Sequence, residues 1–197
     1  MGKRSLRAAQ LEKTRRRKKV YKILGIGASL TVIAFIGFFA WLGLRPSIGE
    51  SIPIMEDAGA HVEEGTDPGP FNSDPPTSGK HYGSEFEAGF YDENSLQAQY
   101  PYPEGYIGHN LEHGYVIFWY NCNLLEVTEC ETLKTQIQDV MDEFDNYKVI
   151  AFPRTSIDVP LAMTSWGQLL RFESFDKKLA SQFVRVNQNR APEPNAE

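Results

Sequence analysis

The feature that most constrains the fold of this 197-residue chain is a run of 22 residues, 23–44, without a charged side chain. A helix rises about 1.5 Å per residue, so such a run spans a hydrocarbon core of about 30 Å. A signal peptide has a shorter apolar core and a cleavage site of small residues, which the sequence FFAWLGLRPS does not offer. The run therefore predicts an uncleaved, single-pass transmembrane helix, with Trp41 near its outer interface.

The charge of the chain changes sign across this run. Residues 1–22 contain ten Lys and Arg against Glu12 alone, a net charge of +9, while the remainder holds 10 basic and 25 acidic residues, a net charge of −15. The positive-inside rule predicts that the basic tail is cytoplasmic, where it contacts anionic lipids, and that the acidic remainder is extracytoplasmic. No set of aromatic residues for base stacking accompanies the basic charges, so we expect no nucleic-acid partner.

These observations divide the chain into five parts. We expect a basic cytoplasmic tail at 1–22, a transmembrane helix at 23–44, a linker at 45–60, an extracytoplasmic domain at 61–190 and a polar tail at 191–197. The predicted location is the cell membrane, with the bulk of the chain outside.

The segment from Arg45 to about Tyr100 is rich in Pro, Gly, Asp and Ser and shows no sustained apolar period. Such a stretch is either a disordered linker or a functional loop that lies on a core. A loop on a core is favoured because the segment carries many aromatic residues, among them Phe71, Tyr82, Phe86, Phe90 and Tyr91.

Regular structure is expected from residue 115 onward. The apolar run Tyr115–Tyr120 predicts a strand buried on both faces. A capping box at Thr128 and Glu131 predicts the start of an amphipathic helix, whose inward positions are Leu133, Ile137, Val140, Met141 and Phe144.

The second half of the domain is predicted to hold three strands and a helix. A short strand at 148–152 ends at Pro153, and residues 161–166 and 168–173 form a hairpin about Gly167. Asp176 caps a last helix. The predicted class is α+β: a small mixed sheet with two covering helices after a long irregular loop segment. The order β-α-β-β-β-α has the outline of a trimmed thioredoxin-like domain.

The two cysteines, Cys122 and Cys130, argue against thioredoxin-like redox chemistry. Those enzymes need C-x-x-C, whereas seven residues separate this pair. An even count in an oxidising compartment favours a disulfide, which would stabilise the fold by roughly 2–3 kcal/mol. The alternative is a dithiol for metal or redox work.

All four histidines lie between residues 61 and 113, and two of them belong to the motif His109-Asn110-Leu111-Glu112-His113. HxxEH is the signature of inverted zinc proteases. That site needs a helix that continues past His113, but Gly114 and a strand follow at once. We therefore expect a tight turn at 109–113, which is the arrangement that lets both imidazoles bind one ion.

Imidazole is the commonest metal ligand and suits copper and zinc. A Pro-Gly loop folded back over the turn would add His81 and His61 to the ligands. The alternative is that these are surface or hydrogen-bonded histidines that cluster without a metal.

Two of these motifs resemble a known family. PPTSGKH, followed some thirty residues later by HNLEHG and then by the segment Pro160–Gly167, resembles the domain of unknown function 3105 family over roughly residues 55–190. The layout of this chain, with a basic tail, a single anchor and an outer domain, is also similar to that of the family. The resemblance brings His81, His109, Glu112 and His113 as motif residues, and it implies no activity because the family has none established. The cysteine pair lies outside the motif set, which favours a disulfide particular to this chain.

The leading hypothesis is a metal-handling or accessory protein whose outer domain binds copper, or second zinc, through five candidate ligands: His61, His81, His109, Glu112 and His113. Glu112 could instead orient an imidazole through its free N–H. The first alternative is a structural subunit of a larger membrane complex, with hydrogen-bonded histidines and an acidic, aromatic-rich docking face. The second is a zinc-dependent hydrolase, for which no catalytic residue is predicted.

Overall fold

The computed structural model describes residues 16, 18, 21–22, 24–27, 29–37 and 48–195. The chain divides into two units, 1–45 and 46–197. In the first unit the described residues are helical and exposed. The hydroxyls of Ser29 and Thr31 donate to the carbonyl oxygens of Gly25 and Gly27, one helical turn earlier.

The prediction of a transmembrane helix at 23–44 is wrong. Within the parts of the chain that the structure describes, no helix is long and apolar enough to cross a membrane. Residues 23, 28 and 38–44, including Trp41, lie outside the described residues. The single-pass, extracytoplasmic and cell-membrane placements depended on this helix and are corrected with it.

The second unit is built on a mixed sheet of six strands in the order β1-β6-β5-β3-β4-β2. β3 pairs parallel with β4 and antiparallel with β5, and β5 continues antiparallel to β6. The short strands β1 and β2 extend the two edges. The strands are β1 (Glu50–Ser51), β2 (Gly89–Phe90), β3 (Val116–Tyr120), β4 (Val149–Pro153), β5 (Leu161–Ser165) and β6 (Gln168–Phe172).

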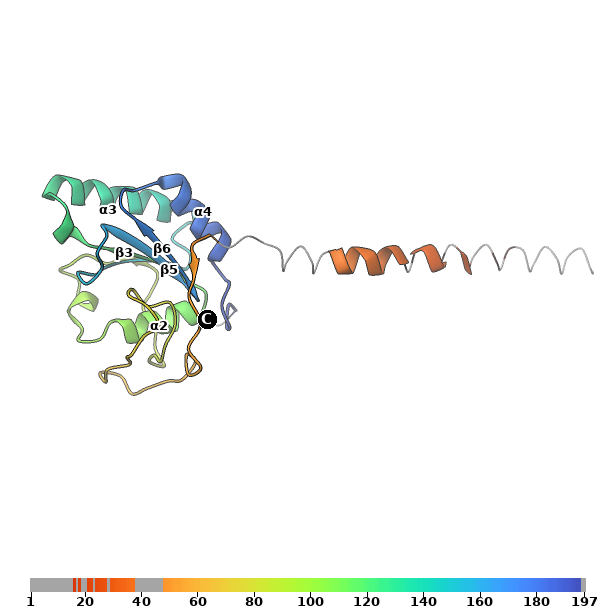
Figure 1. Cartoon of the computed structure of the whole chain (residues 1–197), viewed down its shortest axis with the longest axis horizontal. Coiled ribbons are helices and arrows are strands. Elements are labelled where there is room, and N and C mark those ends of the chain that lie inside the picture. The colour runs from red at the N-terminus through yellow and green to blue at the C-terminus, as the bar shows by residue number, and fades with distance from the viewer. Residues whose placement is uncertain are drawn as a thin grey trace, which may run out of the picture. The chain divides into compact units, whose positions relative to one another are not determined.

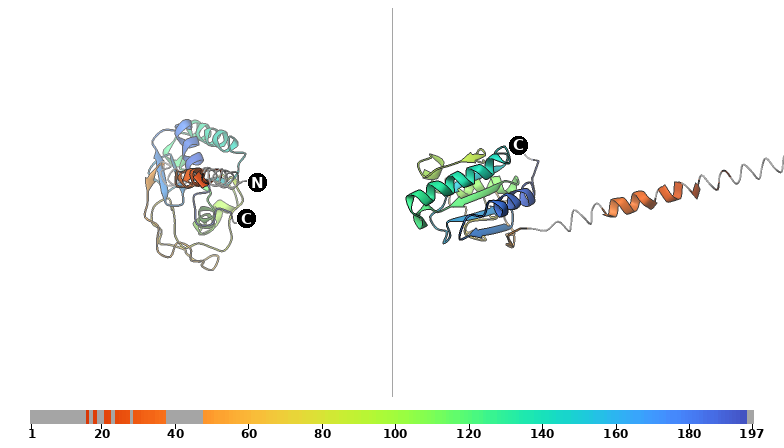
Figure 2. Two further views of the ribbon diagram at one scale, coloured as in Figure 1. Left: turned by 90° about the vertical axis from the view of Figure 1, so that its right-hand side faces the viewer. Right: turned by 90° about the horizontal axis from the view of Figure 1, so that it is seen from above.

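Helices cover both faces of this sheet. α3 (Val127–Asp142) and α4 (Lys177–Asn187) lie side by side on one face, and α2 (Glu104–Glu112) lies on the other (Figures 1 and 2). This unit also contains two short 3-10 helices, η1 (Gln97–Gln99) and η2 (Cys122–Leu124). The unit therefore has three layers, with loops and α2 on the face away from α3 and α4.

Each layer boundary holds its own apolar core, because side chains alternate along a strand. In β3, Val116, Phe118 and Tyr120 face α3 and α4, while Ile117 and Trp119 face α2. All five residues are buried, which confirms the predicted strand with two covered faces.

Most of the predicted element order is confirmed. β3, α3, β4, β5, β6 and α4 follow one another as β-α-β-β-β-α. The hairpin turns at Gly167, whose φ of 68° is left-handed, and Asp176 caps α4 by accepting a hydrogen bond from the Leu179 amide. The predicted capping box is wrong by two residues, because Glu126 and Glu129 form the box that begins α3.

The Pro-rich segment before α2 is an ordered loop on the core, as predicted from its aromatic residues. Asn72 organises it: its Oδ1 accepts the amides of Thr77 and Ser78, and its Nδ2 donates to the Pro53 carbonyl and the Thr77 hydroxyl. Thr77 is fully buried, and its carbonyl accepts the Gly167 amide from the β5–β6 turn. The PPTSG motif is thus tied directly to the sheet.

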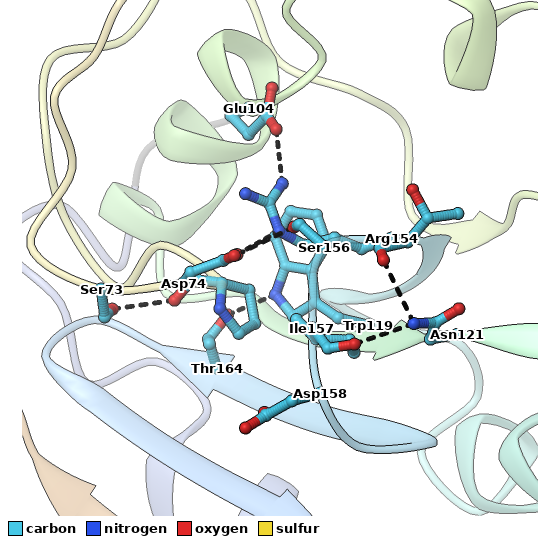
Figure 3. A network of polar contacts seen from close by, with 12 residues as sticks. Ser73, Asp74, Glu104, Trp119, Asn121, Arg154, Ser156, Ile157, Asp158 and Thr164 are labelled. Atoms are coloured by element: carbon cyan, nitrogen blue, oxygen red, sulfur yellow. Dashed lines mark hydrogen bonds and ion pairs between the residues drawn. The ribbon is translucent and has the colours of Figure 1, made fainter. Parts of the chain in front are cut away.

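A second polar network holds the same loop against β4 and α2 (Figure 3). The Arg154 guanidinium pairs with both Asp74 and Glu104, and it lies 5.3 Å from the centre of the Trp119 ring. Arg171 donates to the Asp74 backbone carbonyl. These contacts fix the loop that carries His81.

Candidate metal centre

The motif His109-Asn110-Leu111-Glu112-His113 forms the last turn of α2. Gly114 follows with a left-handed φ of 83°. Its amide donates to Leu111, and the Tyr115 amide donates to Asn110, the pair of bonds that ends a helix in a Schellman motif. The predicted tight turn is therefore the end of a nine-residue helix, and β3 follows almost immediately.

Two glycines inside α2 let the histidine loop lie directly on the helix. A methyl group at Gly108 would sit 2.7 Å from the Cβ of His81, and one at Gly105 would sit 2.3 Å from the Tyr82 ring. The Tyr82 amide donates to the Gly105 carbonyl at 2.9 Å. Gly108 thus allows the close approach of His81 to the helix.

Asn110 and Leu111 hold the motif in place. The Asn110 side chain accepts the Phe86 amide and donates to the Phe86 carbonyl, so it satisfies both backbone groups of that loop residue. Leu111 is fully buried in the core beneath the helix. The side chains of His109, Glu112 and His113 contact polar partners instead.

His61, His81, His109 and Glu112, which we call the three-histidine cluster, converge on one point. One potential ligand atom from each lies within 4.8 Å of all the others. The three imidazole centres are 5.0, 5.2 and 5.2 Å apart. His61 and His81 are held together by a parallel β-bridge between their loop segments, a contact that spacing along the sequence does not predict.

The hydrogen bonds of two imidazoles select which nitrogen is free. His81 Nδ1 lies 3.0 Å from the Gly79 carbonyl oxygen, and His109 Nδ1 lies 2.8 Å from the Tyr82 carbonyl oxygen. A carbonyl oxygen only accepts, so each Nδ1 carries a hydrogen. The Nε2 atom of each ring is therefore the one with a lone pair to offer in the neutral state.

His81 Nε2 faces a second acceptor, since it lies 3.0 Å from Oε2 of Glu112. His81 is fully buried and Glu112 is 7% exposed. A neutral imidazole lone pair and a carboxylate oxygen repel each other at this distance, so either a proton or a metal ion must lie between them. Two ligands of one tetrahedral ion at about 2.0–2.1 Å lie roughly 3.3 Å apart, close to the observed separation.

His113 belongs to a different set. Its Nδ1 lies 2.9 Å from Oε2 of Glu85, and Glu85, His109 and His113 form a second group with convergent ligand atoms. The rings of His109 and His113 are 4.3 Å apart. Of the five predicted ligands, the structure thus brings four together and places His113 beside Glu85. No motif distinguished Glu85 from the other acidic residues of its loop.

The family comparison agrees with these motifs. Residues 61–197 match the family described as protein of unknown function (DUF3105). The chain belongs to this family. The matched region begins at His61 and contains the whole three-histidine cluster together with His113. No curated protein and no solved structure matches this DUF3105 protein, so the thioredoxin-like outline stays a prediction.

Burial sets the protonation of His109. Desolvation lowers the pKa of this imidazole, with smaller opposing and supporting contributions from the Tyr82 carbonyl, His113 and His81. Burial also raises the pKa of the nearby Tyr115 hydroxyl to about 12. The neutral form of His109 is favoured, which keeps its Nε2 lone pair available for a cation.

Cys122 and Cys130 are joined by a disulfide, with their Cα atoms 5.3 Å apart. The bond links η2 to the first turn of α3. The predicted disulfide is confirmed, and with both sulfur atoms in that bond the structure contains no dithiol at this position.

Proposed function

We propose that this DUF3105 protein binds one transition-metal ion, copper or zinc, through the three-histidine cluster and serves in metal handling. The observation that carries the proposal is the contact between His81 Nε2 and Glu112 Oε2. Two acceptor atoms meet there in a buried site, where a cation between them removes their repulsion, and the ligand atoms of His61 and His109 converge on the same point.

The chemistry of the ligands supports the same conclusion. Imidazole suits both copper and zinc, and zinc sites of histidine and carboxylate ligands are common. The side chains of His81, His109 and Glu112 are buried or nearly so, whereas His61 is exposed. The separations of up to 4.8 Å must shrink to about 3.3 Å around a tetrahedral ion. Rotation of the exposed His61 side chain is the adjustment that the packing resists least.

The zinc-hydrolase alternative has weaker support. An inverted zinc protease needs the motif glutamate beside a water bound between His109 and His113. Glu112 instead contacts His81 in the three-histidine cluster. In addition, α2 ends at the motif rather than continuing past it.

The test is a metal titration of the purified full-length chain after treatment with a chelator. Zinc and copper are added separately against a competing indicator at neutral pH. We expect one ion per chain, bound less tightly at acid pH as imidazoles take up protons. His61→Ala and His81→Ala should each weaken binding by at least about tenfold.

The variant His113→Ala decides between the two groups of ligands. The proposal requires a larger loss of affinity in His61→Ala than in His113→Ala, because His61 belongs only to the three-histidine cluster. The opposite order would place the ion beside Glu85. A wild-type protein that binds neither metal at neutral pH would refute the proposal altogether.

A further inference from the structure

A second candidate site lies behind Tyr82, on the side of α2 where the chain forms a small aromatic cavity. Its volume is about 130 Å³, and it is lined by four tyrosines and two loop residues, which together we call the tyrosine pocket: Tyr82, Tyr100, Tyr102, Tyr106, Gly65 and Pro101. Pockets for drug-sized ligands measure about 300–1,000 Å³. The tyrosine pocket therefore admits one small chemical group rather than a ring system.

The rings meet at large angles. The planes of Tyr82 and Tyr106 cross at 76° with their centres 4.8 Å apart, and those of Tyr100 and Tyr106 cross at 46° with centres 5.6 Å apart. Tyr82 is 1% exposed and is packed closely against Gly105. Tyr82 is thus a rigid, buried base of the pocket, and the half-buried Tyr100, Tyr102 and Tyr106 provide the aromatic surface that a ligand can reach.

Two of the tyrosine hydroxyls are already committed to acceptors of the chain. Tyr82 donates to the Thr66 carbonyl at 2.7 Å, and Tyr106 donates to Oε2 of Glu64 at 3.1 Å. Phe86 stacks on one face of Tyr106 with ring centres 4.7 Å apart, so the other face of that ring is the part of Tyr106 that a ligand can contact. The two hydroxyl bonds favour a ligand that needs no hydrogen bond.

The surroundings of the pocket are acidic. Glu64 holds the Tyr106 hydroxyl, and Glu104 and Asp67 add to burial in raising the pKa of the Tyr82 hydroxyl. Glu104 also pairs with Arg154, so Glu64 and Asp67 supply most of the unbalanced negative charge. Carboxylates near the negative faces of aromatic rings attract a cation.

We propose that the tyrosine pocket binds a fully alkylated ammonium group, such as the trimethylammonium head of choline. Such a group combines positive charge with an apolar surface and has no N–H to satisfy, which matches a cage of aromatic rings. A primary ammonium would lose its hydrogen bonds to water on entry. A neutral group of the same shape would gain nothing from the acidic surroundings.

The test compares choline with its neutral isostere 3,3-dimethylbutan-1-ol, and uses tetramethylammonium as the minimal probe. Each is titrated into the full-length chain, and binding is followed by calorimetry and by ligand-observed NMR. We expect the two cations to bind at least about tenfold more tightly than the neutral isostere. Tyr100→Ala should lower the affinity for choline at least about tenfold. Tyr100→Phe should keep most of the wild-type affinity, because the ring remains.

Tyr147→Ala is the matched control, since Tyr147 is an exposed tyrosine that does not line the pocket. Equal affinities for choline and the neutral isostere would overturn the proposal and leave an unspecific apolar cavity. Loss of choline binding in Tyr147→Ala, with Tyr100→Ala unaffected, would also overturn it. If Tyr100→Ala fails to fold, the ratio of the two affinities in the wild-type protein still decides. None of these binding measurements requires a metal ion in the three-histidine cluster.

Discussion

The contact between Glu112 and His81 leads to a sharp prediction, because glutamine and alanine at position 112 should behave differently. In the wild-type protein the two side chains need a proton or an ion between Nε2 and Oε2, which are 3.0 Å apart. In Glu112→Gln the amide has nearly the same shape, and its N–H can donate to the neutral His81 ring. In Glu112→Ala the buried Nε2 of His81 has lost this partner.

The expected magnitudes follow from burial. Removing one partner of a buried, charge-assisted pair costs about 3–5 kcal/mol, so Glu112→Ala should lower the free energy of unfolding by roughly 3 kcal/mol or more. Glu112→Gln replaces the pair by a neutral hydrogen bond and should cost about 1 kcal/mol. For a chain of this size 1 kcal/mol corresponds to about 2–4 °C in Tm. We therefore expect Tm to fall by about 6–12 °C in Glu112→Ala and by less than about 4 °C in Glu112→Gln.

The response to added zinc distinguishes the role of the Glu112 carboxylate in metal binding from its role in fold stability. An ion at one hundred times its Kd stabilises the native state by about 2.7 kcal/mol, which corresponds to a Tm increase of roughly 5–10 °C. A tenfold loss of affinity in Glu112→Gln would reduce this increase by about half. Glu112→Gln should therefore fold well without metal and respond weakly to zinc.

Differential scanning calorimetry with and without zinc measures both effects. Glu87→Gln is the matched control because it removes a carboxylate from an exposed position of the same region. Equal destabilisation by glutamine and alanine at position 112 would refute the shared-proton argument. A zinc response in Glu112→Gln equal to that of the wild type would show that the carboxylate is not a ligand.

Three further predictions concern the surroundings of the site. Gly108→Ala would stabilise an open helix by about 1 kcal/mol, but the added methyl meets His81 at 2.7 Å. We therefore expect a net loss of about 1–2 kcal/mol in urea unfolding, and a gain would show that the loop moves freely. Replacing Cys122 and Cys130 by serine should lower the free energy of unfolding by roughly 2–3 kcal/mol, and an unchanged value under non-reducing conditions would argue against the bond. Because burial lowers the pKa of His109, the unfolded chain takes up this proton first as pH falls below about 6.5. His109 therefore contributes to a decline in stability from that pH down to its own lowered pKa, and a stability in urea that stayed constant over this window would contradict the shift.

Local patterns predicted the sheet and its helices because each signal acts over a few neighbouring residues. The continuous apolar run Val116–Tyr120 and the turn at Gly167 depend little on distant parts of the chain. The start of α3 was harder to place, because Thr128 with Glu131 and Glu126 with Glu129 both have the spacing of a capping box. Glu126 forms the cap since its backbone is extended, with a ψ of 156°, just before the first helical residue. The charge-free run at 23–44 predicted a spanning helix from apolar length alone, and none is found within the described residues.

The candidate site could be predicted as a set of residues but not as a geometry. Histidine enrichment and two motifs identified the candidate ligands, because imidazole is the commonest metal ligand. Their grouping depends on long-range contacts. The bridge between His61 and His81 brings in the exposed histidine, and Glu85 draws His113 into the neighbouring group. Both contacts arise where the irregular segment folds over α2, and no periodicity describes that segment.

The glycines of α2 explain why this segment and the helix must form together. Each glycine inside a helix costs about 1 kcal/mol relative to alanine, and α2 has two of them in nine residues. An isolated helix of that length is unstable in water. Its stability therefore comes from contacts that only the loop and the sheet provide: Tyr82 on Gly105, His81 on Gly108 and Phe86 on Asn110. Loop and helix form one cooperative unit, so an ion held between them would stabilise both at once. The same contacts place Tyr82 between the three-histidine cluster and the tyrosine pocket, with its carbonyl on His109 and its ring in the pocket.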